Sequence, residues 1–259
     1  MPATPVVIGV IPSRYASQRL PAKPLVDLDG KPMVQRVYEQ AKKSRLLDRV
    51  VVATDDVRIE EAVRGFGGDV MLTSQEIKSG SDRVAAVALH MEGDIFVNIQ
   101  GDEPLMAPEM IDQGVRLLLD NTSAPVGTLI RQISSYEELL NPNVVKVVLN
   151  NSGYALYFSR AAVPYVRGET DRSRWLEWHT FYKHIGLYIY QRKFLMQYAQ
   201  LPISQLEKAE KLEQLRILEA GYKMITGITA YDSISIDTPE DVDRVIKLLR
   251  QTSSGGKTK

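Results

Sequence analysis

Three positively charged side chains lie in one segment that directly follows an apolar run. Arg14, Arg19 and Lys23 come after Val6–Ile11, in a long loop without glycine. Cations and free backbone N–H groups at the end of a buried strand can hold a polyphosphate through charge-assisted hydrogen bonds. The alternative is an exposed loop with solvated cations, and the position directly after the first predicted strand favours ligand binding. The spacing matches neither the Walker A loop nor the dinucleotide fingerprint.

An acidic segment follows another apolar run. Residues Gln100–Pro104, with the sequence QGDEP, come after the predicted strand Asp94–Ile99. Acidic residues and glycine are common in turns, so a plain turn is one interpretation. The other is that Asp102 holds Mg²⁺ at the sheet edge, because this cation takes oxygen ligands and usually shares them with phosphate. The pattern by itself leaves both interpretations open.

Asp237 is a second candidate ligand for the same cation. It precedes Thr238–Asp241, whose sequence TPED has the features of a helix start. These are a hydroxyl at the N-cap, proline at the first helical position and acids in the first turn. Capping accounts for Thr238–Asp241 but does not require Asp237, which therefore remains available as a metal ligand.

The other polar candidates have no pattern that selects one chemistry. His90, His179 and His184 lack metal-ligand spacing, and the sequence contains neither a serine triad nor a zinc motif. Arg160 ends a predicted strand, where it either clamps a carboxylate or caps the strand. Three glutamates recur on one predicted helix, where a solvated face is expected; they are Glu207, Glu210 and Glu213.

Strands and helices alternate along the first half of the chain. The strands are predicted at Val6–Ile11, Val50–Ala53, Asp69–Leu72 and Asp94–Ile99, and the helices at Lys31–Ser44, Ile59–Arg64, Ser81–Met91 and Pro108–Asp120. Continuous β-branched runs are typical of parallel strands that are covered on both faces. The predicted fold class is therefore α/β, a mostly parallel twisted sheet with helices on both faces. Ligands bind beyond the carboxyl ends of the strands in such a sheet, where the candidate loops lie.

The pattern changes near residue 125. Strands are predicted at Val126–Arg131, Val144–Leu149, Tyr154–Ser159, Ile185–Tyr190, Lys223–Thr229 and Ser233–Ile236, and helices at Leu206–Ala220 and Thr238–Arg250. A hairpin loop at 150–153 indicates antiparallel pairing. We predict one domain over residues 1–251, with a smaller antiparallel β subdomain at about 126–190 and a disordered tail at 252–259.

Composition excludes several classes of function. The 32 Lys+Arg residues balance 32 Asp+Glu residues, so no basic field exists to hold nucleic acid or an anionic membrane. The absence of cysteine excludes disulfides, thiolate zinc sites, iron–sulfur clusters and a cysteine nucleophile. There is no targeting signal and no apolar run long enough to span a membrane, so we expect a cytoplasmic protein.

Taken in order, these segments resemble the cytidylyltransferases that activate 3-deoxy-D-manno-octulosonate (Kdo). The resemblance runs from about Val6 to Arg250, and its ordered set of motifs is highly specific although each motif alone is weak. The motifs are VVIGVIPSRYASQRLPAKPL, GKPM, VVATDD, SGSDRV, NIQGDEP, NPNVVKVV, GYALYFSRAAVPY, KHIGLY, KLEQLR and IDTPED. Three departures are mild: Ser13 replaces the usual alanine, SGSDR replaces the commoner SGTER, and Ile189 stands where glycine is common.

The resemblance implies a cofactor, two substrates and the residues that contact them. The implied cofactor is Mg²⁺, with Asp102 and Asp237 as its ligands and with Arg14 and Lys23 on the CTP phosphates, and these four residues form the catalytic set. The implied nucleotide-binding residues are Pro12, Ser13, Arg14, Lys23, Ser79, Gly80 and Asp102. The implied sugar-acid contacts are Arg83, Gln100, Arg160, His184, Tyr188 and Glu213. The family fold is of the nucleotide-diphospho-sugar transferase type, and a homodimer is implied.

The reaction that the resemblance implies is the transfer of CMP from CTP to the anomeric hydroxyl of Kdo, with release of pyrophosphate. It would supply sugar for lipopolysaccharide. One alternative is a cytidylyltransferase for another sugar acid, such as sialic acid or 8-amino Kdo. Another is a nucleotide-binding protein that has lost catalysis. A nucleic-acid-binding module is disfavoured by the neutral charge.

Overall fold

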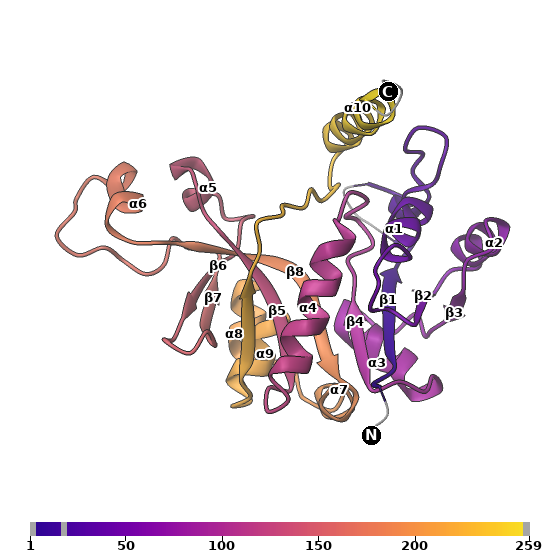
Figure 1. Ribbon diagram of the computed structural model, residues 1–259, viewed down its shortest axis with the longest axis horizontal. Coiled ribbons are helices and arrows are strands. Elements are labelled where there is room, and N and C mark those ends of the chain that lie inside the picture. Colours follow the sequence, from indigo (N-terminus) through magenta and orange to yellow (C-terminus); the bar gives the residue numbers. More distant parts are fainter. Residues whose placement is uncertain (1–3, 17–19, 256–259) are drawn as a thin grey trace. The chain divides into compact units, whose positions relative to one another are not determined.

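The computed structural model describes residues 4–16 and 20–255, the last four of these by their backbone alone. The chain groups into two compact units (Figure 1): unit 1 is Met1–Asp112 with Asp232–Lys259, and unit 2 is Gln113–Tyr231. Within the described part of the chain, no helix has the length and apolar character to cross a membrane. Arg19 and the end of the predicted tail, 256–259, lie outside the described residues.

Unit 1 contains parallel strands in the order β3-β2-β1-β4. Their bounds are β1 Val7–Ser13, β2 Arg49–Thr54, β3 Val70–Leu72 and β4 Ile95–Asn98. The side chains of β4 and nearly all of those of β1 and β2 are buried, as the continuous apolar runs predicted. The prediction of a parallel sheet is confirmed.

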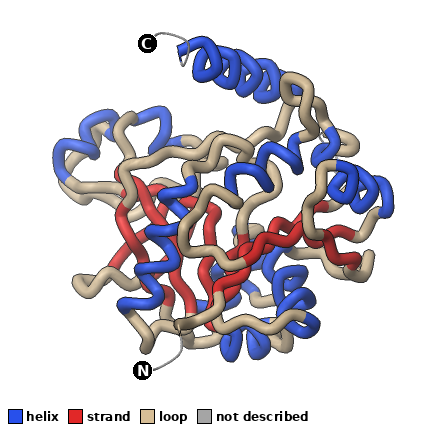
Figure 2. Tube along the Cα trace, turned by 45° about the vertical axis from the view of Figure 1, so that its right-hand side comes forward, coloured by secondary structure: helices blue, strands red, loops and turns tan. Residues whose placement is uncertain are grey.

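The helices of unit 1 lie in the connections between these strands and at the C-terminus (Figure 2). They are η1 Lys23–Leu25, α1 Met33–Ala41, α2 Val57–Gly65, α3 Gly80–His90 and the C-terminal α10 Pro239–Gly255. The strand order steps in one direction through β1, β2 and β3 and then returns to β4. Because parallel crossovers are right-handed, α1 and α2 cover one face of the strands and α3 covers the other.

The register of unit 1 places two candidate loops next to each other. β1 pairs with β4 so that Val10 lies opposite Asn98, where β4 ends, and β1 ends at Ser13. The loop that carries Arg14 and the loop that carries Asp102 therefore leave the same edge of the sheet.

Unit 2 is built on β5 Val126–Gln132, which pairs antiparallel with β8 Tyr182–Gln191 and parallel with β9 Met224–Ile228. The hairpin of β6 Lys146–Leu149 and β7 Ala155–Ser159 joins β8 through β6. The helices are α5 Tyr136–Leu140, η2 Arg172–Arg174, α6 Trp175–Trp178, α7 Arg192–Tyr198, α8 Gln205–Glu210 and α9 Gln214–Glu219. The helix α4 Pro108–Asp120 crosses the boundary between the units.

Three element predictions need correction. Ser233–Ile236 is not a strand but extended chain, held by a hydrogen bond from the Ile236 N–H to the carbonyl of Asp102. The helix predicted at Leu206–Ala220 is divided into α8 and α9, because Lys211 adopts a left-handed conformation with φ of 56°. The final helix continues to Gly255, so the backbone of the predicted tail is helical at 252–255.

The boundary of the second unit also differs from the predicted insertion at 126–190. Unit 2 extends to Tyr231 because β9, which follows the insertion in sequence, pairs with β5. Pairing between strands distant in sequence sets this boundary, and no change in composition marks it.

Candidate active site

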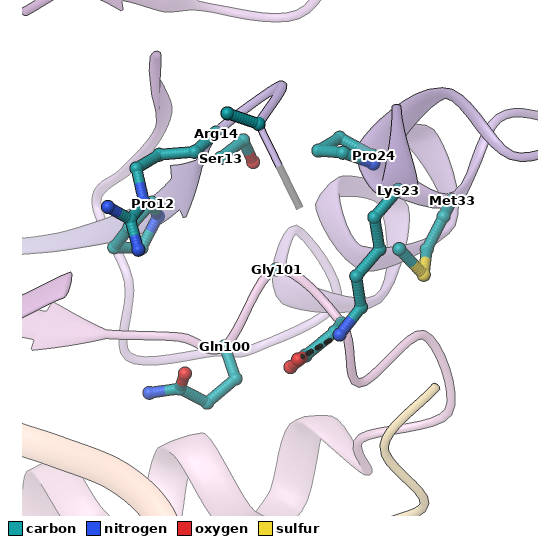
Figure 3. Close-up of a pocket in the computed structure, with 10 residues that line it drawn as sticks. Pro12, Ser13, Arg14, Lys23, Pro24, Met33, Gln100 and Gly101 are labelled. Atoms are coloured by element: carbon teal, nitrogen blue, oxygen red, sulfur yellow. Dashed lines mark hydrogen bonds and ion pairs between the residues drawn. The ribbon is translucent and has the colours of Figure 1, made fainter. Parts of the chain in front are cut away.

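A cavity of about 570 Å³ lies in unit 1, where the chain leaves β1 and β4. Its size is that of a typical small-molecule site. The lining residues are Pro12, Ser13, Arg14, Ala16, Lys23, Pro24, Met33, Gln100, Gly101 and Asp102 (Figure 3). The cationic loop and the acidic loop, which are separated in sequence, therefore meet at one cavity.

Gly101 allows the two loops to approach closely. A Cβ atom at this position would lie 2.6 Å from the carbonyl oxygen of Pro12 and 3.2 Å from the Ser13 hydroxyl. Side chains essentially never come this near to a backbone atom, so any other residue at Gly101 would push the loops apart. The glycine thus sets the width of the cavity at this point.

Lys23 connects the two predicted metal ligands. Its Nζ lies 2.6 Å from Oδ2 of Asp102 and 3.0 Å from Oδ1 of Asp237. Figure 3 shows the Lys23 side chain extended from η1 toward the loop that contains Gly101. Burial acts to lower the pKa of Lys23, but the charges and hydrogen bonds of the two carboxylates outweigh it and raise that pKa. The ammonium group is therefore charged and shared between both aspartates.

Asp237 is positioned by the start of α10. The Asp241 carboxylate accepts hydrogen bonds from the backbone N–H groups of Asp237 and Thr238 and from the Thr238 hydroxyl. The Asp241 N–H in turn donates to Thr238 Oγ1, at 3.4 Å. Thr238 and Asp241 therefore cap each other at the start of α10, and their hydrogen bonds hold the backbone of Asp237 in place.

The residues fit a magnesium ion bound together with a substrate phosphate. The described part of the chain contains no cluster of three or more acidic or histidine side chains that could enclose a metal. It does place the carboxylate oxygens of Asp102 and Asp237 around one cation, the Lys23 ammonium. Mg²⁺ commonly takes only one or two carboxylates from the protein and completes its shell with phosphate and water.

Glu103 is a polar residue of this site that sequence reasoning did not select. Its side chain is buried, and Oε2 finds no hydrogen-bond partner among the described residues. Burial raises the pKa of Glu103 to about 7, and the nearby charges of Asp102 and Asp232 act in the same direction. The sequence did contain a signal for Glu103, because it directly follows the predicted ligand Asp102 and two adjacent carboxylates repel each other.

Ser79 and Gly80 lie where α3 begins. The Ser79 hydroxyl caps the helix by accepting from the Asp82 N–H at 3.0 Å. A Cβ on Gly80 would lie 3.5 Å from the Asn98 amide and 3.9 Å from Pro12. The structure thus places Gly80 beside the end of β1, while neither residue is among those that line the cavity.

Arg83 has partners other than a sugar acid. It is fully buried, and its Nη2 lies 2.8 Å from Oδ2 of Asp55 and 3.0 Å from the carbonyl of Ile77. Its Nη1 contacts the hydroxyl of Thr73. In this structure the guanidinium fastens the segment before α3.

Three polar side chains lie together in unit 2. His184 and Tyr188 belong to the expected sugar-acid set, and Gln214 follows Glu213 of that set in sequence. The His184 ring is 5.2 Å from the Tyr188 ring between centroids, and the Tyr188 hydroxyl donates to Oε1 of Gln214 at 3.0 Å. His184 Nε2 lies 2.9 Å from Oγ1 of Thr128. Burial lowers the pKa of His184 to about 3, so the ring is neutral at physiological pH. Gln214, which the sequence reasoning passed over, is buried with Nε2 unpaired among the described residues.

Arg160 lies at the end of β7 and is tied to the end of α8. Its Nε donates to the carbonyl of Glu210 at 2.7 Å, and Nη1 donates to the carbonyl of Pro142 at 2.9 Å. Its backbone N–H donates to the carboxylate of Glu210 at 2.9 Å. Glu213 occupies the N-cap position of α9, but its side chain does not cap the helix.

The prediction of a solvated glutamate face is wrong for Glu207 and Glu210. Glu207 is buried in an ion pair with Arg216, at 2.6 Å between Oε1 and Nη2. Glu210 accepts from the Ser159 hydroxyl at 2.6 Å. Both side chains therefore contact other parts of unit 2, which the helical periodicity did not predict.

Comparisons with known proteins bear on this site. A family model described as cytidylyltransferase matches residues 8–225. A 3-deoxy-manno-octulosonate cytidylyltransferase of Geobacter sulfurreducens is 49% identical over 251 residues, which cover 94% of this chain and 99% of the relative. One of the same name from Parabacteroides distasonis is 51% identical over 248 residues, covering 93% and 97%. A solved structure of CMP:2-keto-3-deoxy-manno-octonic acid synthetase complexed with CTP matches with a TM-score of 0.89 and 42% identity, covering 95% of this chain and 99% of that one.

Proposed function

This chain belongs to the 3-deoxy-manno-octulosonate cytidylyltransferase family, and we propose that it transfers CMP from CTP to the anomeric hydroxyl of Kdo. The products are CMP-Kdo and pyrophosphate. The observation that carries the proposal is the pair Asp102 and Asp237 around Lys23, at a cavity lined by Arg14. This arrangement supplies both cationic partners for phosphates and carboxylate ligands for a cation.

The chemistry is an in-line displacement at the α-phosphorus. A bond forms between the anomeric oxygen of the sugar acid and the α-phosphorus, the bond from this phosphorus to the pyrophosphate oxygen breaks, and the hydroxyl proton is lost to solvent. Negative charge develops on the nonbridging oxygens and on the leaving group. Arg14 and Lys23 would donate to these phosphate oxygens, since preorganised cations stabilise charge that develops in the transition state.

Asp102 and Asp237 would hold Mg²⁺ in this site. When it is bound, the ion supplies positive charge that offsets the charge on the phosphoryl oxygens. The close approach at Gly101 keeps the Asp102 loop against the end of β1. The hydrogen bond from the Ile236 N–H to the Asp102 carbonyl holds the segment that carries Asp237 beside the same loop.

The residues that the family resemblance implies for the sugar acid include Gln100, Arg160, His184, Tyr188 and Glu213. Arg160 is suited to a carboxylate because its planar guanidinium can donate two parallel hydrogen bonds. His184, Tyr188 and Glu213 would contact sugar hydroxyls, with the neutral imidazole of His184 serving as a hydrogen-bonding group and carrying no charge. Orientation of the attacking hydroxyl is the contribution expected of these residues.

The setting that fits this reaction is a cytoplasmic homodimer that supplies activated sugar for lipopolysaccharide. Support for these parts of the proposal comes from the family resemblance. Size-exclusion chromatography with light scattering at micromolar protein concentration tests the dimer.

Pyrophosphate release tests the activity. The purified chain is assayed with CTP and Mg²⁺ against a panel of sugar acids that contains Kdo, 8-amino Kdo and N-acetylneuraminate. We expect the highest kcat/KM with Kdo. A higher kcat/KM with another sugar acid would identify that compound as the substrate. CTP binding without pyrophosphate release from any sugar acid would indicate a nucleotide-binding protein without catalysis.

A further inference from the structure

We propose that Lys23 is an internal counter-cation that holds Asp102 and Asp237 until the nucleotide arrives and then gives up its place to the divalent cation. The two aspartates are far apart in sequence, and the Lys23 ammonium contacts both of them. The inference rests on the proposed function, in which these aspartates are the metal ligands.

The contacts of Lys23 are those of a cation held in a carboxylate site. The ammonium has three donors, and two of them are directed at Asp102 and Asp237, at 2.6 and 3.0 Å. The lysine side chain is only 13% exposed, whereas the two aspartate side chains are 31% and 33% exposed. The lysine side chain is therefore more enclosed than the aspartate side chains that it bridges.

The charges of Lys23, Asp102 and Asp237 do not balance. One ammonium offsets one of two carboxylates, so the three side chains together carry a net charge of about −1. A divalent cation at the same two aspartates would offset both charges. The ammonium and the divalent cation cannot share the same oxygens, because two cations a few ångströms apart in a partly buried site repel each other strongly.

The cavity offers Lys23 a second set of partners. Lys23 and Arg14 both line it, so a triphosphate bound there would present oxygens to the ammonium. The backbone of Lys23 is fixed in η1, where the Leu25 N–H donates to the Ala22 carbonyl at 2.8 Å and Pro24 is buried. The four-carbon stem of the side chain is flexible, so the ammonium can change partners while the backbone remains in place.

Cooperative binding of nucleotide and metal follows from this exchange. Without nucleotide, a metal ion must compete with the lysine for the two carboxylates. With nucleotide, the ammonium pairs with phosphate and the carboxylates become available. The coupling is reciprocal, so the metal also increases the affinity for the nucleotide.

Mn²⁺ binding to the nucleotide-free protein tests the exchange, because it reports on the aspartates without turnover. Free Mn²⁺ is measured by electron paramagnetic resonance with wild type, Lys23→Met, Lys23→Gln and the control Lys31→Met. Lys31 also forms an ion pair, with Glu39 at 2.7 Å, but it does not line the cavity. We expect both Lys23 variants to bind Mn²⁺ about tenfold more tightly than wild type, and Lys31→Met to bind it as wild type does.

A double variant locates the bound ion. The gain in affinity should disappear in Lys23→Met combined with Asp237→Asn. Equal or weaker Mn²⁺ binding by both Lys23 variants overturns the proposal, and so does a gain that persists in the double variant. If Lys23→Met does not fold, the same comparisons are made with Lys23→Gln, whose amide still donates to a carboxylate.

The two proposals can fail separately. Turnover of CTP and Kdo by the wild type together with unchanged Mn²⁺ affinity in the Lys23 variants would refute the exchange and leave the function intact. Tighter Mn²⁺ binding in those variants, with no turnover of any sugar acid by the wild type, would refute the proposed function and leave the exchange intact.

Discussion

Protonation of His184 should limit the stability of the protein in acid. His184 is partly buried in unit 2, and its Nε2 lies 2.9 Å from the Thr128 hydroxyl. That hydroxyl donates to the carbonyl of Leu187 at 2.7 Å, so its oxygen accepts from an Nε2–H and the ring is the neutral Nε2 tautomer. Burial is the cause of the lowered pKa, and no charged neighbour opposes it.

The size and sign of the effect follow from linkage. The pKa of His184 falls from its ordinary value of 6.5 to about 3 in the folded protein. Between these values the unfolded chain binds a proton that the native protein does not bind. The contribution of His184 is therefore fully present above pH 6.5 and is lost as the pH falls toward 3. At pH 5 the loss amounts to about 2 kcal/mol of unfolding free energy.

Urea denaturation at pH 7.5 and pH 5.0 measures this loss. The variant His184→Gln keeps a donor toward Thr128 but cannot titrate, so it should lose about 2 kcal/mol less than wild type between the two pH values. Comparison of the pH-dependent changes in the two proteins cancels the contributions of other titrating groups. His179→Gln is the matched control, because this ring is exposed, and it should behave as wild type.

The same pH dependence in wild type and His184→Gln would refute the reasoning. It would mean that the ring gains a proton in the folded protein as easily as in the unfolded chain. A drop in the stability of His184→Gln that is equal at both pH values is this same refuting outcome, because it leaves the pH dependence unchanged.

Other perturbations address the active site. Asp102→Asn should lower kcat roughly 100-fold or more at saturating Mg²⁺, the scale of losing one electrostatic element; Asp69→Asn, which alters an exposed ion pair, is the control, and near-normal turnover of Asp102→Asn would remove it from the metal site. Arg160→Lys should raise the KM for Kdo more than that for CTP, and equal increases would contradict the clamp. Gly101→Ala should cost roughly 1–3 kcal/mol of unfolding free energy, because its Cβ meets a carbonyl oxygen at 2.6 Å, and a urea midpoint like that of wild type would contradict this. Glu103 has a raised folded pKa of about 7, so its contribution is fully present below pH 4.5 and is lost as the pH rises through 7; without divalent cation, Glu103→Gln should remove a stability loss of about 3 kcal/mol between pH 4.5 and 8, which a pH series of urea melts would show.

The parallel sheet and the loops at its edge were predictable because they depend on local pattern. Continuous apolar runs identified β1, β2 and β4, and a hydroxyl followed by proline and two acids identified the start of α10. The order of motifs along the chain identified the family, since that order is itself a property of the sequence. Asp237 was a candidate ligand because capping at Thr238–Asp241 does not require it, whereas the pattern around Asp102 left a plain turn equally open and the family resemblance selected it.

Only the tertiary structure determined which groups share an environment. Residue types do not reveal that Lys23 bridges Asp102 and Asp237, nor that the guanidinium of Arg83 is taken up by Asp55. The extended chain at Ser233–Ile236 was mistaken for a strand because its apolar alternation is the same, whereas its hydrogen bond goes to the Asp102 loop. The apolar pattern of a segment indicates which of its side chains avoid water. Charge pairing and burial depend on distances between segments far apart in the chain, and only the folded structure sets those distances.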